Sequence, residues 1–178
     1  DTADISLPAT GMATVSFDMH GHDGKQRVDI PGFETFLADA ALMLQWVRQT
    51  YPGLPICIMG HSMGALIATH LALGRFANEA DIKGFVLSSP YYVNAVKVPK
   101  IMLALSGVLA KLFPTAKVPM EAVTDLLTHD KDITARHYAD EKDHIRASEA
   151  SFRFATSLLG AQAALAGGLN AVKHPVFA

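Results

Sequence analysis

The sequence is organised around residues 60–64, GHSMG, in which two glycines flank a serine. The four residues before it, ICIM at 56–59, are apolar and lie between a proline and a glycine, which predicts a fully buried strand. The residues after it, 63–73, combine small side chains and leucines at helical spacing. Ser62 is therefore predicted to lie on a sharp strand-to-helix turn, where a side chain at either flanking glycine would collide with the turn.

A serine on such a turn has a specific chemical use. The turn lifts the hydroxyl above the sheet edge, so that a histidine can remove its proton and its oxygen can attack an ester carbonyl. Ser62 is thus the candidate nucleophile. The helix that begins at Met63 points its free N–H groups and positive dipole end at the same place, which makes the backbone N–H of Met63 the candidate oxyanion donor.

Composition bounds the class of protein. The 178 residues suffice for one domain with a real core, and half of them are hydrophobic. The formal net charge is −2, from 15 basic and 17 acidic residues without a long run of either sign, which argues against nucleic acid as a partner. Cys57 is the only cysteine, so there is no internal disulfide and no cysteine metal cluster. No apolar run reaches the ~18 residues of a membrane span, and we expect a cytoplasmic protein.

The first half of the chain alternates strands and helices. We expect a strand over 12–17, an amphipathic helix from 33 to 47 that stops at 51–53, then the strand and helix around Ser62, and a further strand over 84–88. These strands are apolar throughout instead of alternating, which favours a parallel sheet with helices on both faces. The predicted class is α/β.

The alternation of predicted strands and helices ends after residue 90. Prolines punctuate the sequence, helical patterns occur at about 100–112, 120–128 and 147–166, and no convincing strand is visible, which indicates an inserted helical cap. The pattern at 100–112 is apolar nearly all round, so this helix is either buried, which we favour, or rests on lipid or an acyl chain. We divide the chain into a core (1–90), a cap (91–170) and the start of another core strand (171–178).

Three motifs together resemble a known fold. They are VSFDMHGH at 15–22, GHSMG at 60–64 and VLSSP at 86–90. In order and spacing they are similar to the α/β-hydrolase fold, and within it to the monoacylglycerol lipase and lysophospholipase-like serine hydrolases, a group that includes serine aminopeptidases. The sequence departs from that pattern at 23–25, DGK, where the family usually has a second glycine and a small polar residue.

The resemblance also implies parts that do not lie in these residues. The family places a His-Gly oxyanion loop one strand before the strand at 12–17, and its catalytic acid and histidine follow strands later than the one begun at Val176. We therefore expect the catalytic acid and histidine outside this chain, and expect the 178 residues to be an interior portion of a longer enzyme.

Several other polar residues are candidates for catalysis or metal binding. His61 is expected to pack beside the turn, with its side chain leaving in another direction from Ser62, and Asp18 is expected to brace a loop. His20 and His22 form an H-x-H pattern, but Gly24 and Lys25 stand where metallohydrolases continue it, so we expect no metal there.

A group of acidic and histidine residues in the cap could in principle hold a cation, but solvated surface charge explains it more simply. Its members are His129, Asp130, Asp132, His137, Asp140, Asp143 and His144. Four methionines could soften an acyl channel, although core filling is the simpler interpretation. They are Met59, Met63, Met102 and Met120.

The sequence therefore predicts a serine hydrolase that cleaves a carboxylic ester of a lipid-like substrate through an acyl-enzyme on Ser62, without a cofactor or metal. The resemblance supplies monoacylglycerol and lysophospholipid as examples. A thioesterase, a peptidase or a carbon–carbon hydrolase on the same scaffold remains open, as do a non-catalytic binding protein and a metal-dependent hydrolase that uses His20 and His22. Peripheral membrane contact through the cap and the oligomeric state also stay open.

Overall fold

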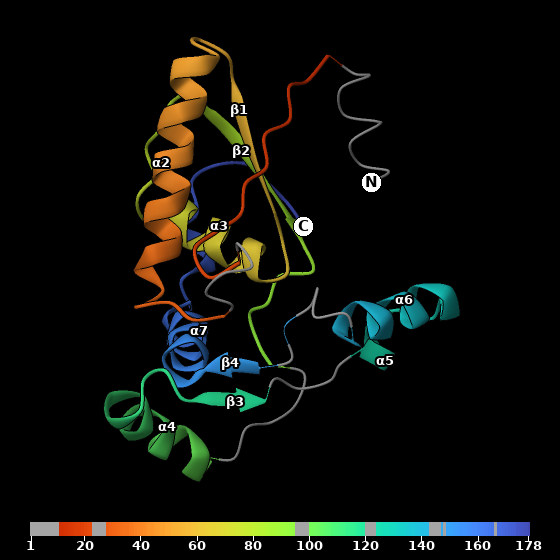
Figure 1. Cartoon of the computed structure of the whole chain (residues 1–178). Helices are drawn as coiled ribbons and strands as arrows, with labels where there is room; N and C mark the ends of the chain where they lie inside the picture. The colour runs from red at the N-terminus through yellow and green to blue at the C-terminus, as the bar shows by residue number, and fades with distance from the viewer. Residues whose placement is uncertain are drawn as a thin grey trace.

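The computed structural model describes residues 11–22, 28–94, 100–119, 124–142, 147, 149–165 and 167–178 (Figure 1). Its helices and strands follow one another in the order α2 (Glu34–Thr50), β1 (Ile56–His61), α3 (Met63–Leu73), β2 (Ile82–Ser88), α4 (Lys100–Leu112), β3 (Lys117–Pro119), α5 (Thr124–Leu127), α6 (Lys131–Lys142), β4 (Glu149–Ser151), α7 (Phe152–Ala164), the 3-10 helix η1 (Leu169–Ala171) and β5 (Val176–Phe177).

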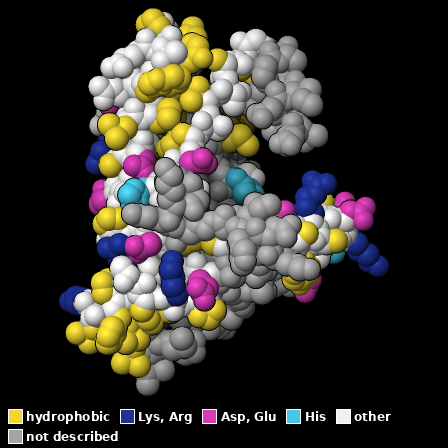
Figure 2. Space-filling view, in the orientation of Figure 1, with side chains coloured by type: hydrophobic (Ala, Val, Ile, Leu, Met, Phe, Trp, Pro, Cys, Tyr) yellow, Lys and Arg dark blue, Asp and Glu magenta, His cyan; other side chains and the backbone are white. Residues whose placement is uncertain are grey.

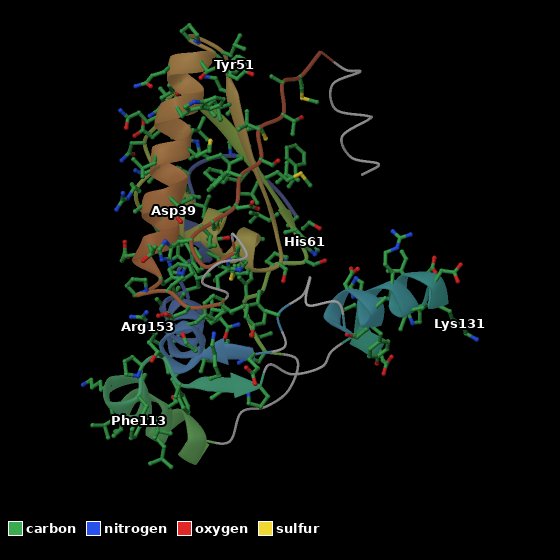
Figure 3. The ribbon with its side chains drawn as sticks, in the orientation of Figure 1. Asp39, Tyr51, His61, Phe113, Lys131 and Arg153 are labelled. Atoms are coloured by element: carbon green, nitrogen blue, oxygen red, sulfur yellow. The ribbon has the colours of Figure 1, made fainter. Side chains whose placement is uncertain are left out.

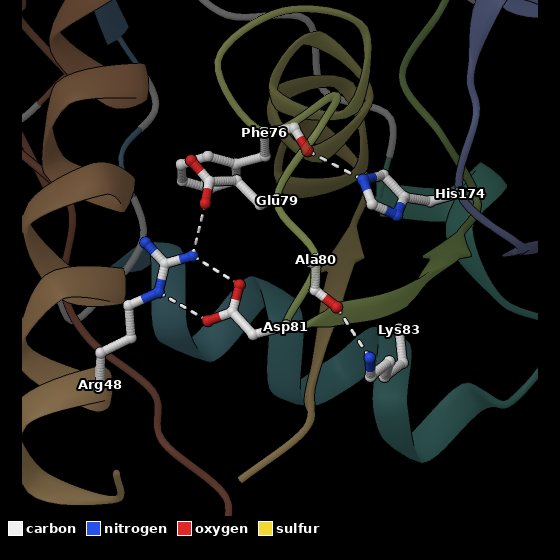
Figure 4. Close-up of polar contacts among 7 residues, drawn as sticks. All are labelled: Arg48, Phe76, Glu79, Ala80, Asp81, Lys83 and His174. Carbon is white, nitrogen blue, oxygen red and sulfur yellow. Dashed lines mark hydrogen bonds and ion pairs between the residues drawn. The ribbon is translucent and has the colours of Figure 1, made fainter. Parts of the chain in front are cut away.

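A parallel sheet with the strand order β1-β2-β5 forms the centre of the core. β1 runs beside β2 from the pair Ile56 and Ile82 to the pair His61 and Ser88, and β5 pairs with β2 in the same direction. Just before β5, the ring Nε2 of His174 donates to the carbonyl of Phe76 at 2.8 Å (Figure 4). This bond ties the entry of β5 to the segment that follows α3. The predicted parallel sheet and the predicted strands before and after α3 are thus confirmed.

Helices α2 and α3 build the core on the sheet. α3 packs directly on β1 and β2, and α2 packs beside α3. Seven of the eleven residues of α3 are buried, on all its faces, because it lies between the sheet and α2 on one side and α7 on the other. α2 follows its predicted amphipathic pattern and buries Phe36, Leu37 and Leu44, which confirms this helix.

Two expectations for the strands are wrong. Residues 12–17 form no strand, because they join no hydrogen-bonded ladder of the described sheet, and Figure 1 shows them as an extended trace. β1 is not fully buried either: Cys57 is exposed and Met59 is 63% exposed, while Ile56 and Ile58 are half-buried. The reason is that β1 is the end strand of the described sheet, and α3 and α2 cover only one of its faces.

The region after residue 90 is only partly as predicted. α4 and α7 confirm two predicted helices, and α5 falls within the predicted helix at 120–128, of which 120–123 lie outside the described residues. The expectation of no strand is wrong, because β3 and β4 form a two-stranded antiparallel sheet, and α6 was not predicted. The division at residues 90 and 170 stays a prediction.

Helix α4 leaves apolar side chains in solvent. Leu105, Val108 and Leu112 are each more than half exposed, as is Phe113 just after the helix, and Figure 2 shows apolar side chains gathered over α4 at the lower end of the molecule. The favoured expectation of a buried helix is therefore wrong for these side chains, because the packing of α4 against α7 leaves them in solvent. We call these four residues the α4 patch. No helix within the described part of the chain is long and apolar enough to cross a membrane.

An arginine near the end of α2 ties this helix to the loop that leads into β2. Arg48 Nε and Nη2 each donate to a carboxylate oxygen of Asp81 at 2.6 Å, and Nη2 also donates to Glu79 at 2.8 Å (Figure 4). The hydrogen bonds from Arg48 lower the pKa of Asp81. This bidentate pair constrains how α2 lies against the residue that precedes β2.

A second bidentate pair joins α7 to the segment before α2. Arg153 Nε donates to Asp29 Oδ1 at 2.7 Å and Nη2 donates to Oδ2, and Figure 3 shows Arg153 below the N-terminal end of α2. Next to it, the backbone N–H of Ser151 donates to the carbonyl of Val28 at 3.0 Å. The hydrogen bonds from Arg153 lower the pKa of Asp29 from 3.8 to about 2.

The ion pair between Arg153 and Asp29 makes the free energy of unfolding depend on pH in the acidic range. Because the pKa of Asp29 is lowered to about 2, its ionised form stabilises the fold fully above about pH 4, and that stabilisation is lost as the pH falls through about 2. We expect Asp29→Asn to lower the free energy of unfolding by about 1–2 kcal/mol at pH 7. Urea denaturation should show that the difference in the free energy of unfolding between variant and parent becomes smaller as the pH falls from 5 to 2. Glu149→Gln, at an exposed carboxylate of β4, is the control and should change the free energy of unfolding little at any pH.

Candidate functional site

Ser62 occupies the strained turn that the sequence predicts. It is the residue between β1 and α3, with φ 52° and ψ −115°, a backbone conformation that residues other than glycine rarely adopt. The residue is half-buried, and its side chain does not cap the helix that follows. Strain of this kind persists only where the surrounding contacts hold it, and it is typical of functional sites.

The two flanking glycines have different roles. A Cβ at Gly60 would lie 2.4 Å from the carbonyl oxygen of Gly64 and 2.7 Å from the nitrogen of Ala65, both backbone atoms that cannot move aside. A Cβ at Gly64 would meet no described atom within 4 Å outside its own helical turn. The expectation that a side chain at either glycine would collide is therefore correct for Gly60 and wrong for Gly64, because Gly64 already lies in α3 and its Cβ would point away from the turn.

The turn after β2 contacts the backbone of Ser62 on both sides. The N–H of Ser62 donates to the carbonyl of Ser88 at 2.9 Å, and the carbonyl of Ser62 accepts from the N–H of Tyr91 at 3.1 Å. The same carbonyl accepts from Ala65 at 3.1 Å in the first turn of α3. Sequence reasoning did not assign this role to residues 88–91. The signal was present in the VLSSP motif, because neighbouring parallel strands end at the same edge of a sheet.

The N-terminus of α3 presents backbone donors beside Ser62. Within the described residues, the N–H of Met63 makes no hydrogen bond, because the helical bonds to the carbonyl of Ser62 begin at Ala65 and Leu66. Such free N–H groups and the positive end of the helix dipole favour negative charge at this place. The geometry thus allows Met63 to donate to an oxyanion on a group bound to Ser62.

None of the described histidines hydrogen-bonds the hydroxyl of Ser62. His61 is exposed, and its Nδ1 is hydrogen-bonded to Ser88 Oγ at 3.0 Å; Figure 3 shows it at the sheet edge, away from Asp39 of α2. His70 Nε2 donates to the carbonyl of Ala161 at 2.9 Å, which ties α3 to α7. His61 therefore lies beside the turn, as expected, with its ring directed to Ser88.

The segment that carries Asp18, His20 and His22 runs along α2. Together with α2 it lines an open groove of about 440 Å³, whose lining includes Asp18, His20, Asp39 and Trp46. The N–H of His20 donates to Asp39 Oδ2 at 2.9 Å, which fixes the segment to α2. The His22 ring packs near Phe36 and Phe154, with ring centroids 5.9 and 6.1 Å away.

The described residues hold no group of three or more histidine, cysteine, aspartate or glutamate side chains placed to bind a metal ion. In the predicted cap, the carboxylate of Asp130 accepts from the N–H of Asp132 and so caps α6, while Asp143 and His144 lie outside the described residues. Met59 is exposed and Met63 half-buried, and the side chains of Met102 and Met120 are not described.

Comparison with known proteins identifies the family. The family model described as serine aminopeptidase, S33, matches residues 5–178. The chain belongs to this family. It is 30% identical over 140 residues to a monoacylglycerol lipase of Mycolicibacterium smegmatis, which covers 76% of the chain and 48% of that protein. It is also 31% identical over 153 residues to phospholipase YtpA of Bacillus subtilis, which covers 85% of the chain and 56% of that protein.

A solved structure shows the same architecture. The crystal structure of the Paleococcus ferrophilus monoacylglycerol lipase matches with a TM-score of 0.70 and 22% identity, over 85% of the chain and 54% of the lipase. The predicted α/β-hydrolase fold and the resemblance to the monoacylglycerol lipase group are confirmed. The chain spans about half the length of these relatives.

The asymmetry of the two glycines leads to a direct test. We expect Gly60→Ala to lower the free energy of unfolding by about 3 kcal/mol, because the new methyl group would overlap the backbone of Gly64. We expect Gly64→Ala to change it by less than about 1 kcal/mol, because alanine is favoured over glycine inside a helix. Thermal and urea denaturation of both variants measure the difference, and an equal effect of the two would contradict the geometry of the turn.

Proposed function

We propose that the whole protein is a serine hydrolase that cleaves a carboxylic ester of a lipid-like substrate through an acyl-enzyme on Ser62. The observation that carries this proposal is the strained backbone of Ser62 between β1 and α3. In the reaction, a base takes the hydroxyl proton, Oγ attacks the ester carbonyl, and the alcohol leaves with a proton. Water then cleaves the acyl-enzyme and releases the acid.

Ser62 and the backbone N–H of Met63 are the two groups of this chain that act in this mechanism. The N–H of Met63 donates to the oxyanion that forms on the carbonyl oxygen, where a preorganised donor lowers the barrier most. We assign the second oxyanion donor, the catalytic acid and the histidine to residues outside this chain, as the resemblance implies. His61 is not the base in this proposal, since its Nδ1 is directed to Ser88. The mechanism requires no cofactor and no metal.

The substrate class follows from the relatives. The two sequence relatives described above are named a monoacylglycerol lipase and a phospholipase. We therefore propose an ester of one acyl chain, a monoacylglycerol or a lysophospholipid. The family description names an aminopeptidase, so a peptidase is the competing activity, and a screen of acyl esters, thioesters and aminoacyl amides separates these reactions.

We also propose that the α4 patch contacts a lipid surface. The patch presents three large apolar side chains on α4 and a fourth just after it to solvent, and the last turn of α4 carries Lys111, a combination found in helices that lie in a membrane interface. A lipid-like substrate is reached most directly from such a surface. A cytoplasmic location with peripheral membrane contact agrees with this proposal and stays a prediction.

Replacement of the nucleophile tests the mechanism. We expect Ser62→Ala to lower kcat for a monoacylglycerol or a p-nitrophenyl ester by about 10⁴-fold or more, because no acyl-enzyme can form. A fluorophosphonate should add one adduct to the parent protein, located at Ser62 by mass spectrometry, and none to the variant. Ser157→Ala, at a serine of α7, is the matched control and should keep both properties.

The competing functions give other results. A metal-dependent hydrolase would lose activity with EDTA and keep it in Ser62→Ala. A non-catalytic binding protein would show neither turnover nor an adduct, and either outcome would overturn the proposed mechanism.

Binding to phosphatidylcholine vesicles tests the α4 patch. We expect Leu112→Glu and Phe113→Glu each to weaken the partition coefficient by about tenfold, because one buried apolar side chain contributes about 1.5 kcal/mol. Ile133→Glu, at an exposed apolar position of α6, is the control and should bind as the parent does. Equal binding of all four proteins in vesicle sedimentation would exclude the α4 patch as the contact.

A further inference from the structure

The strained conformation of Ser62 needs support from outside its own helix. The bonds that its carbonyl accepts from the first turn of α3 form whenever the helix forms, and they do not fix the angle between helix and strand. Two other bonds cross to another segment: the N–H of Ser62 donates to Ser88 at 2.9 Å, and its carbonyl accepts from Tyr91 at 3.1 Å. Residues 88–91 therefore bind both the N–H and the carbonyl of Ser62.

This supporting turn is itself strained. Ser89 has φ 44°, in the left-handed region that serine seldom occupies. A turn of this kind keeps its conformation only if contacts with the surrounding structure stabilise it. The position of Ser62 thus depends on whatever holds residues 88–91 in place.

Helix α7 supplies one of these holding contacts. The side-chain amide of Gln162 donates from Nε2 to the carbonyl of Tyr91 at 3.2 Å, and Gln162 is half-buried. Tyr91 and Tyr92 also pack on the cluster formed by Leu66, Ala161 and Leu165. The Tyr92 hydroxyl is hydrogen-bonded to Thr69 Oγ1 of α3 at 2.8 Å. A continuous set of contacts therefore leads from Gln162 through Tyr91 to the peptide of Ser62.

We infer that Gln162 is a positioning residue for Ser62: its hydrogen bond to Tyr91 holds the turn that keeps the serine in its reactive conformation. The inference rests on the proposed role of Ser62 as nucleophile. It assigns no contact with substrate to Gln162. It places a determinant of nucleophile reactivity on α7, about 100 residues further along the chain.

Two replacements test this inference in the whole protein. Gln162→Met keeps the length and volume of the side chain without a donor, and Gln162→Glu keeps its length and polarity with a carboxylate that only accepts. We expect each to lower the rate of fluorophosphonate labelling of Ser62 and kcat by about fivefold, the effect of one net hydrogen bond, with KM unchanged. We also expect faster hydrogen exchange in peptides that span 58–66 and 86–94.

The control variant separates positioning from stability. Thr156→Val removes hydroxyl bonds to carbonyls of Phe152 and Arg153 within α7 and does not touch the turn, so labelling, kcat and exchange at both peptides should stay as in the parent. A fall in melting temperature alone, with unchanged labelling and exchange in both Gln162 variants, would overturn the inference. If the parent protein is not labelled, the proposed function fails, and the exchange data alone decide whether Gln162 holds the turn.

Discussion

The contact between Gly60 and the backbone of Gly64 is the constraint on which the arrangement of this protein depends. With no Cβ at residue 60, the end of β1 approaches the first turn of α3 so closely that the chain must reverse direction at Ser62. α3 then lies on β1 and β2, and the end of β2 comes next to Ser62, because β1 and β2 run parallel and end at the same edge. One close approach therefore sets the helix, the sheet and the site together.

The parts of the fold that the sequence predicts well are those whose signal is local. The spacing of Phe36, Leu37 and Leu44 predicts α2, and the apolar run before Ser88 predicts β2. Ser62 itself could be placed on a strained turn because glycine, strand and helix signals agree within some twenty residues. The alternation of these elements is also enough to predict a parallel sheet, which the structure confirms.

The parts that were missed depend on partners far away in the chain. β3 and β4 have three residues each, and the strand pairing joins Lys117 to Ser151, so neither segment carries a periodic signal of its own. Residues 12–17 have strand character, but a strand exists only where a second strand pairs with it. The support of Ser62 by residues 88–91 was missed for the same reason, since its hydrogen bonds use backbone groups that every residue possesses.

Helix α7 is fastened to the rest of the protein near both ends. Arg153 binds Asp29 at one end, and at the other the carbonyl of Ala161 accepts from His70. α5 and α6, by contrast, pack on each other on the far side of the cap (Figure 1). Within the described residues, the predicted cap thus divides into a part, α7, that contacts the turn at 88–91 and a part, α5 and α6, for which no such contact is seen. A substitution in α5 or α6 therefore leaves the described hydrogen bonds around Ser62 in place, so these two helices tolerate change without loss of the strained turn.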